Sequence, residues 1–262
     1  MSKTWRLLEK GLFDTHCHPL DYPDPEHWLK ECQSRGVRVH AMSIDPSQYL
    51  QLRQLTLDVP QIHASLGLYP LNIDQDEIGL SQVLDLIPDS PFIGEVGLDF
   101  SEECPSPALQ MKTLERILSS CDEHGGRIVS LHSRRAGQEV LNLVSKTKLG
   151  SMILHWYSGP LDPLPQLPEH VYFSVNTAML RSRNGQALLE HCPRNRILLE
   201  SDGPYIESGG KPVYPWDLKS VVESLSSRWN SSLESTLELL QENLARVDAS
   251  MESASLRAPP QS

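Results

Sequence analysis

Two histidines, His16 and His18, stand two residues apart near the start of the chain, in the segment FDTHCH. On an extended strand, side chains two residues apart point to the same face, so both imidazoles can bind one metal ion. By the same alternation Cys17 points to the opposite face, where a small side chain of this kind packs in a core. Two surface imidazoles at a strand end would give the same spacing, so this motif needs support from the rest of the chain.

A glutamate, Glu95, lies inside the apolar segment FIGEVGLDF, residues 92–100. Carboxylates are seldom buried without a partner, so a glutamate in such a segment requires a cation nearby. A neighbouring arginine would satisfy this requirement, and so would two metal ions that share the carboxylate. The choice between them depends on the other candidate ligands.

Three further residues end apolar runs: His132 in IVSLHSR, His155 in MILHWYSG and Asp202 in ILLESDGPY. One histidine in such a place is more often structural, but histidines and carboxylates at five strand ends are not explained by chance. The whole set exceeds one closed tetrahedral site and suits two divalent ions that share a carboxylate. It comprises His16, His18, Glu95, His132, His155 and Asp202.

Such a pair of ions would support hydrolysis. Two ions lower the pKa of a shared water and hold the attacking and leaving oxygens of a phosphodiester. We expect Glu95 and Asp202 to be the catalytic residues, with Glu95 between the ions and Asp202 as acceptor of the proton from water. Imidazole ligands favour zinc, manganese or iron over magnesium, and the sequence leaves zinc, manganese and magnesium open.

Strands separated by helix-like stretches could bring these residues together. The expected strands are Leu12–His16, Val37–Ile44, His63–Leu68, Phe92–Leu98, Ile128–His132, Met152–His155, Val171–Val175 and Ile197–Glu200. The expected helices include Pro25–Arg35, Ser47–Asp58, Pro107–His124, Arg134–Lys146 and Gly185–His191. Parallel strands need such crossovers, so the pattern predicts an α/β fold, a TIM-like (β/α)8 barrel with its active site at the carboxyl ends of the strands. Seven strands in a more open sheet would give nearly the same pattern.

A length of 262 residues suits a single domain of this kind. After the loop Tyr205–Trp216, two C-terminal helices are expected to pack on the barrel, Trp216–Arg228 and Ser232–Val247. We place the barrel domain at residues 1–248. The polar, proline-containing tail, residues 249–262, is expected to be disordered.

The chain is acidic, with 23 Lys and Arg against 34 Asp and Glu and a formal charge of −11. A protein that coats nucleic acid usually has the opposite sign, so a nucleic-acid substrate must be held locally, by metal ions and a few arginines. We expect no membrane span and no signal peptide, because the long apolar runs that these require are missing from the sequence. The five scattered cysteines, without a C-x-x-C pair, favour a cytoplasmic location.

The segments DTHCH, GEVGLD, HSR, HWYSG, ESDGPY and NLAR (residues 243–246) resemble, in order and spacing, the motifs of TatD-type deoxyribonucleases. The resemblance runs from about Phe13 to Val247 and implies a TIM-like barrel. It also implies metal-dependent hydrolysis of DNA, typically from the 3′ end and with a preference for single strands.

The same resemblance assigns individual roles. It implies that His132 and His155 bind one ion, that His16, His18 and Asp202 bind the other, and that Glu95 lies between them. It further implies that Asp14 and Asp99 orient imidazoles or a ligand water.

One segment departs from the family pattern. A histidine that is proposed to contact substrate phosphate usually follows strand three in a G-x-H-P segment, but here the segment is GLYP and the residue is Tyr69. Tyr69 can donate a hydrogen bond to substrate but carries no positive charge. Arg134, the last residue of the HSR motif, is the expected phosphate contact, since a guanidinium matches phosphate geometry. Trp156, Tyr157 and Tyr205 could stack on unpaired bases, or simply pack.

The segment HPLDYPDP, the spacing to CQSRGVRV and the ESDGP ending also resemble a narrower branch, the TatD-like nuclease components of a bacterial anti-phage gene cassette. That resemblance implies partner subunits in a defence complex. Two alternatives remain open. One is an amidohydrolase-type enzyme acting on a C–N or ester bond, although that class commonly bridges its metals with a carbamylated lysine. The other is a largely inactive, partner-binding subunit.

Overall fold

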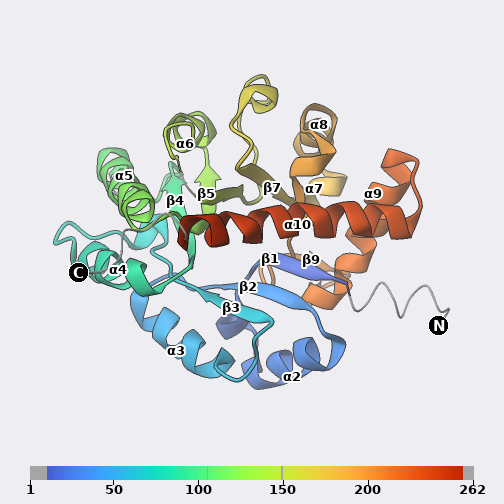
Figure 1. Ribbon diagram of the computed structural model, residues 1–262, viewed down its shortest axis with the longest axis horizontal. Coiled ribbons are helices and arrows are strands. Elements are labelled where there is room, and N and C mark those ends of the chain that lie inside the picture. The colour runs from blue at the N-terminus through green and yellow to red at the C-terminus, as the bar shows by residue number, and fades with distance from the viewer. Residues whose placement is uncertain (1–10, 105, 149, 256–262) are drawn as a thin grey trace.

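Eight parallel strands form the centre of the computed structural model, which describes residues 11–104, 106–148 and 150–255. Figure 1 shows helices ringed around these strands. The strands are β1 (Phe13–Cys17), β2 (Arg38–Met42), β3 (Ile62–Ser65), β4 (Phe92–Asp99), β5 (Ile128–Arg134), β6 (Ser151–Leu154), β7 (Val171–Val175) and β8 (Ile197–Leu199).

The strands close into a barrel across two seams. Regular pairing gives the parallel sheets β1-β2-β3 and β4-β5-β6-β7-β8. At the first seam the Leu66 amide donates to the Phe92 carbonyl, and the Gly94 amide donates to the Leu66 carbonyl, both at 2.9 Å. At the second seam the Asp202 amide donates to the His16 carbonyl at 2.9 Å, just beyond the end of β8. The predicted TIM-like barrel is therefore confirmed.

Most crossovers are helical and begin at a cap that the sequence supplies. Asp24, Asp45 and Ser106 each precede a proline, and each side chain accepts a hydrogen bond from a backbone amide of the first turn. Proline at the first helical position costs no hydrogen bond, so these pairs start helices efficiently. The crossover helices are α2 (Pro25–Arg35), α3 (Pro46–Thr56), α4 (Ile78–Leu86), α5 (Pro107–Glu123), α6 (Gly137–Val144), α7 (Thr177–Arg181) and α8 (Arg183–His191).

Some elements differ from the prediction. Helix α6 begins later than the predicted start at Arg134, because β5 continues to Arg134, which pairs with Asp99 of β4. Helices α4 and α7 were not predicted. Between β6 and β7, where every residue is described, the chain forms a 3-10 turn at Leu164–Gln166 in place of an α-helix.

The last two helices are α9 (Lys219–Trp229) and α10 (Leu233–Ser255). Helix α10 crosses the amino-terminal ends of the strands, in front of the barrel in Figure 1. The Asn243 side-chain amide donates to the Ile197 carbonyl at 2.8 Å, and Arg38 pairs with Asp248 at 2.8 Å. Helix α10 extends to Ser255, past the predicted end of the barrel domain at residue 248, and the rest of the predicted tail, 256–262, lies outside the described residues.

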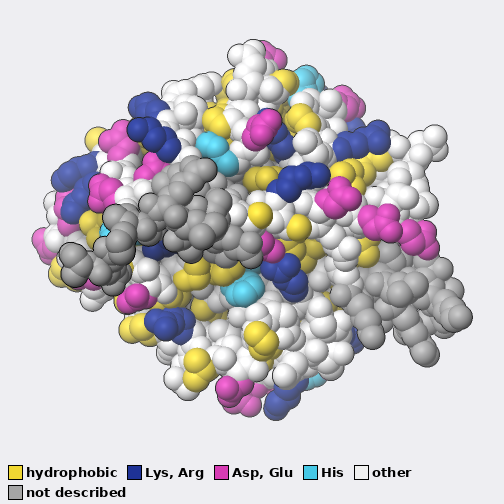
Figure 2. All heavy atoms as spheres, viewed as in Figure 1, with side chains coloured by type: hydrophobic (Ala, Val, Ile, Leu, Met, Phe, Trp, Pro, Cys, Tyr) yellow, Lys and Arg dark blue, Asp and Glu magenta, His cyan; other side chains and the backbone are white. Residues whose placement is uncertain are grey.

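The strands are buried on both faces, which makes polar residues in them informative. All residues of β1, β4 and β7 are buried, as expected for strands with core on one side and helices on the other. Cys17 is fully buried, as predicted. Among the described residues, no helix is long and apolar enough to cross a membrane. On the described part of the face in Figure 2, basic and acidic side chains are interspersed.

Candidate metal centre

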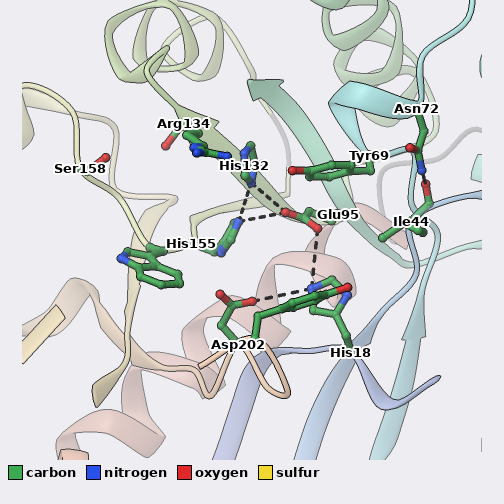
Figure 3. Close-up of a pocket in the computed structure, with 13 residues that line it drawn as sticks. His18, Ile44, Tyr69, Asn72, Glu95, His132, Arg134, His155, Ser158 and Asp202 are labelled. Carbon is green, nitrogen blue, oxygen red and sulfur yellow. Dashed lines mark hydrogen bonds and ion pairs between the residues drawn. The ribbon is translucent and has the colours of Figure 1, made fainter. Parts of the chain in front are cut away.

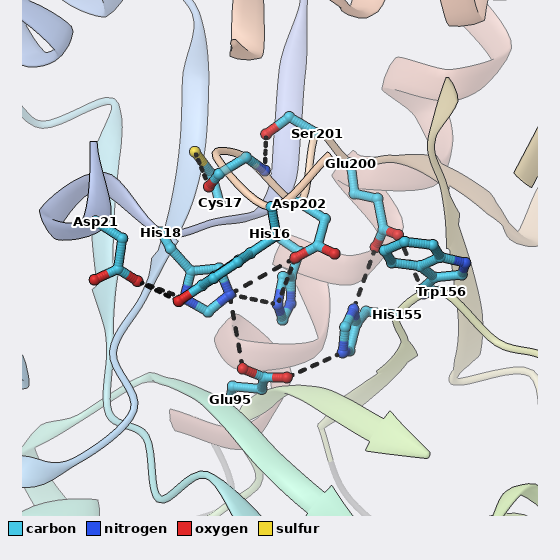
Figure 4. Close-up of polar contacts among 12 residues, drawn as sticks. His16, Cys17, His18, Asp21, Glu95, His155, Trp156, Glu200, Ser201 and Asp202 are labelled. Atoms are coloured by element: carbon cyan, nitrogen blue, oxygen red, sulfur yellow. Dashed lines mark hydrogen bonds and ion pairs between the residues drawn. The ribbon is translucent and has the colours of Figure 1, made fainter. Parts of the chain in front are cut away.

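The six predicted ligands converge at the carboxyl ends of the strands (Figures 3 and 4). This is the end at which barrel enzymes place their active sites. His16 lies in β1, Glu95 in β4 and His132 in β5, while His18, His155 and Asp202 follow β1, β6 and β8. Their donor atoms form overlapping groups whose members lie within 4.8 Å of one another, so the predicted convergence is present.

We call His16, His18 and Asp202, with one oxygen of Glu95, the first cluster. The Nε2 atoms of His16 and His18 are 3.2 Å apart, and Asp202 Oδ1 lies 3.9 and 3.7 Å from them. Glu95 Oε2 is 3.6 Å from His18 Nε2. Two imidazole nitrogens bound tetrahedrally to one zinc ion would lie about 3.3–3.4 Å apart, given the usual Zn–N distance. The spacing in the first cluster therefore fits a shared cation.

We call His132 and His155, with the other oxygen of Glu95, the second cluster. Glu95 Oε1 lies 2.8 Å from His132 Nδ1 and 3.3 Å from His155 Nε2. The two histidine nitrogens are 3.2 Å apart. The same spacing argument applies, so each cluster presents donor atoms suited to one ion.

Glu95 joins the two clusters because its oxygens face different histidines. Its backbone amide donates to the Ser43 carbonyl at 3.0 Å, which fixes the backbone from which the side chain projects. A Cβ on Gly67 would lie 1.7 Å from that carbonyl oxygen, so only glycine permits this close approach of the chain beside β4. The Glu95 side chain itself is only 6% exposed.

Hydrogen bonds orient the histidines. Asp99 Oδ2 lies 2.9 Å from His132 Nε2, which leaves Nδ1 directed at Glu95. The Ser130 hydroxyl lies 2.7 Å from His16 Nδ1 and likewise leaves Nε2 directed into the first cluster. The sequence suggested this role for Asp99 but not for Ser130, since nothing in the sequence pairs β5 with β1 across the barrel interior.

Asp14 acts on the backbone instead of on an imidazole. Its Oδ1 accepts hydrogen bonds from the amides of His16 and Ser201, each at 3.0 Å. The carboxylate thus joins the segment that carries His16 to the segment that carries Asp202. Burial raises the pKa of Asp14 to about 7.

Glu200 is a residue of the centre that the sequence reasoning missed (Figure 4). It is fully buried and accepts hydrogen bonds from Asn176 Nδ2 at 2.7 Å and from the Trp156 amide at 3.1 Å. Glu200 Oε2 lies 3.9 Å from His155 Nδ1. The missed signal was an acidic residue at the end of the apolar run ILLE, the same signal that identified Asp202 two residues later.

Burial and charge set the protonation of the centre. Burial opposes charge on Glu95, but hydrogen bonds with the histidines of the second cluster hold the pKa of Glu95 well below its usual range. Burial also opposes charge on His132, yet hydrogen bonds with Asp99 and Glu95 raise the pKa of His132 to about 9. Burial and the nearby charges of Glu200 and Glu95 raise the pKa of Asp202 well above its usual range. A buried carboxylate in this situation is stabilised strongly by a bound cation.

A cavity of about 740 Å³ opens over both clusters. Tyr69 lies beside His132 with its hydroxyl 3.4 Å from Asp99 Oδ2, and the Arg134 side chain, 57% exposed, approaches the same carboxylate at 4.0 Å (Figure 3). Asn72 and Ser158, which the sequence did not single out, also line the cavity.

Two exposed aromatic residues face the same cavity, Trp156 and Tyr205. Trp156 has a left-handed backbone with φ of 37°, and its amide is held by Glu200. The Tyr205 ring packs edge-on against His18 with centroids 5.1 Å apart, and its hydroxyl donates to Asp21 at 2.7 Å. The Tyr205 side chain and the Trp156 backbone are therefore held at the cavity, and both ring surfaces are accessible. Tyr157, which was also a candidate to stack on bases, is instead buried in the core.

The comparison with known protein families agrees with this geometry. Residues 13–247 match the family model described as TatD related DNase. The chain belongs to this TatD family. It is therefore a metal-dependent hydrolase of a nuclease family, with histidine and carboxylate clusters able to hold metal.

Individual TatD relatives span most of the chain. Human "Deoxyribonuclease TATDN3" is 26% identical over 92% of this chain and 96% of its own length. The "3'-5' ssDNA/RNA exonuclease TatD" of Edwardsiella piscicida is 31% identical over 59% of this chain and 64% of its own length. The crystal structure of the TatD homologue YJJV from Escherichia coli K12 has a TM-score of 0.79 at 22% identity, covers 91% of this chain and 98% of its own, and supports the fold.

Proposed function

We propose that this TatD-family protein is a two-metal exonuclease that shortens single-stranded DNA from its 3′ end. The observation that carries the proposal is the position of Glu95, which directs one oxygen to each cluster. The human and Edwardsiella relatives are named as nucleases, which supports nucleic acid as the substrate.

In this proposal the first cluster holds one divalent ion, the second cluster holds another, and Glu95 is shared. Zinc, manganese and magnesium are the candidates, and the imidazole content favours the first two. Bound ions supply Lewis acidity and an activated water for phosphodiester hydrolysis. Asp202 would accept the proton from that water, because its carboxylate lies beside the two histidines that would hold the same ion.

The cavity residues would bind the DNA end. Arg134 would hold a phosphate near the second cluster, and the Tyr69 hydroxyl would donate one hydrogen bond to it. Trp156 and Tyr205 present accessible rings on which unpaired bases can stack, a contact that needs no particular sequence. This local grip is compatible with a net charge of −11.

The residue between the clusters favours a nuclease over an amidohydrolase. The amidohydrolase class commonly places a carbamylated lysine between its metals, whereas this chain has Glu95, and β4 contains no lysine. A partner-binding subunit without activity is also less well supported, since every predicted ligand is present and lies with the others.

The activity test uses a 5′-labelled single-stranded oligonucleotide incubated with the protein and manganese, magnesium or zinc. Shortening from the 3′ end gives a ladder, and matched duplex DNA and single-stranded RNA define the substrate preference. Glu95→Gln and His132→Ala should abolish the ladder, whereas Glu26→Gln, on an exposed helix surface, should not. If no metal supported cleavage of DNA but the protein hydrolysed cyclic amides, the assignment would change from nuclease to amidohydrolase.

We also propose that the nuclease works in the cytoplasm beside other subunits of an anti-phage complex. The acidic charge of −11, which suits docking to basic protein surfaces better than wide DNA contact, supports this proposal. The five cysteines are all free, as expected in a reducing compartment. Co-expression with the neighbouring genes, followed by size-exclusion chromatography, tests it: elution as a lone monomer would refute the complex.

A further inference from the structure

A second cavity, of about 580 Å³, opens at the other end of the barrel. Its lining includes His170, Tyr172 and Arg196, which lie at the amino-terminal ends of β7 and β8, and Arg246 from α10. The metal ligands lie at the carboxyl ends of the strands, so the length of the barrel separates the two sites.

Arg196 is the most unusual residue in this cavity. Its Nη1 atom is buried and has no hydrogen-bond partner among the described residues, and no described carboxylate forms an ion pair with it. The residue as a whole is only half-buried and it lines the cavity, so its side chain can meet an anion that enters from solution. An arginine stays charged at every ordinary pH, so the anion would always meet a cation there.

Arg246 approaches the cavity from α10 with a fixed orientation. Its Nη1 donates to Asn243 Oδ1 at 2.8 Å and to the Asn195 carbonyl at 3.4 Å. Its ion pair with Glu242 is long, at 3.5 Å, and the Glu242 side chain is 65% exposed, so most of the positive charge remains available.

The two guanidinium groups line the same cavity as Tyr172. Burial raises the pKa of Tyr172, and the charges of Arg246 and Arg196 oppose that increase, in agreement with their shared position in the lining. The lining carries two arginines and one acidic residue, Glu169. Nearby, Glu242 pairs with Arg246 and Asp122 acts on His170.

An apolar surface completes the cavity. His170 Nε2 lies 3.1 Å from Thr147 Oγ1, whose hydroxyl donates to the Val144 carbonyl, so the neutral His170 ring uses its N–H in that contact and the arginines are left to hold the anion. The ring of Tyr172 and Pro193 add apolar surface beside the arginines. A cavity of this volume falls within the range of sites for small organic ligands and exceeds what a bare phosphate needs.

We propose that this cavity binds a phosphate monoester of about mononucleotide size, with Arg196 and Arg246 holding the phosphate. Guanidinium groups pair with phosphate oxygens in a planar, two-bond geometry, and two of them suit a dianion. The apolar surface would contact the organic part of the ligand. The proposal is independent of the nuclease activity at the opposite end of the barrel.

The test is isothermal titration of the full chain in EDTA with dAMP, inorganic phosphate and succinate. EDTA removes metal-dependent phosphate binding at the first and second clusters. One dAMP should bind per chain, and Arg196→Gln and Arg246→Gln should each weaken it about tenfold or more, as expected for loss of a charge-assisted hydrogen bond. Arg53→Gln, an exposed arginine on α3, should leave the affinity unchanged.

The three ligands and the arginine variants distinguish the possible results. Tighter binding of dAMP than of phosphate supports a nucleotide-sized ligand, and equal binding would reduce the site to one for free phosphate and overturn the proposed size. Three results would each overturn the proposal. Succinate could bind as tightly as dAMP, binding could be lost in Arg134→Gln but kept in Arg196→Gln, or dAMP could fail to bind at all.

Thermal unfolding gives an independent readout. If Arg196 serves a ligand, removing its unpaired charge in Arg196→Met should leave the Tm of the ligand-free chain unchanged or higher. If Arg196 instead supports the fold, the same variant should melt at a lower temperature, and the proposal would be wrong.

Discussion

Glu95→Gln keeps the size and shape of the side chain and removes its negative charge. The first cluster then retains three ligands, His16, His18 and Asp202, whereas the second retains only His132 and His155. An ion held by two neutral imidazoles is bound much more weakly than one held by three ligands that include a carboxylate. We therefore expect the second ion to be lost first, so that the metal content falls from about two ions to about one per chain.

The assay is elemental analysis after dialysis against a fixed low concentration of zinc or manganese, paired with the exonuclease rate. Because both ions are needed in the proposed reaction, the rate should fall about 1,000-fold or more, although one ion stays bound. Glu26→Gln, whose side chain is 78% exposed, is the control and should retain both ions. If Glu95→Gln kept two ions with unchanged affinity, the assignment of Glu95 between two clusters would be wrong.

Other substitutions test the cavity and the charges around it. Arg134→Gln should raise KM about tenfold and leave kcat nearly unchanged, since the exposed guanidinium is expected to bind phosphate and not the reacting water; an unchanged KM would contradict this role. Trp156→Ala should reduce the preference for single strands over duplex by about tenfold, measured as the ratio of kcat/KM values, and an unaltered ratio would exclude base stacking on this ring. Tyr69→His should raise kcat/KM by about tenfold or less by restoring a positive group, and a fall would show that the tyrosine suits this substrate better. In EDTA the Tm should decrease as the pH rises: Glu200, with its pKa raised from 4.5 to about 8, loses its stabilising contribution between pH 4.5 and 8, and His132, with its pKa raised from 6.5 to about 9, loses its contribution between pH 6.5 and 9. Scanning calorimetry of Glu200→Gln should show a smaller decrease, and an equal decrease would exclude Glu200 as a contributor.

The convergence of the six candidate ligands could be predicted from the sequence because the governing rules are simple. Alternation along a strand placed His16 and His18 on one face, and a carboxylate inside an apolar run singled out Glu95. The expectation that separate strand ends meet at one rim followed from parallel strand order. The first two steps need only a few consecutive residues, and the third needs only the order of the strands along the chain.

The supporting residues could not be predicted in the same way. Glu200 contacts the Trp156 amide, and Ser130 contacts His16, only after distant strands have come together in the barrel. The family resemblance gave Asp14 the role of orienting an imidazole or a ligand water, and its contact with the Ser201 amide, 187 positions away in sequence, could not be predicted. Helix α7 was missed since it has only five residues, and helix α4 was missed since no side chain caps its first turn.

The seam between β1 and β8 joins the earliest and the latest strands of the barrel, and His16 and Asp202 lie directly at it. During synthesis, a chain still on the ribosome holds His16 and His18 long before Asp202 exists. The donor set of the first cluster is therefore incomplete until the last strand has been made and has docked. A fragment released early cannot form the whole centre, so metal loading at the proposed site would report that the barrel has closed.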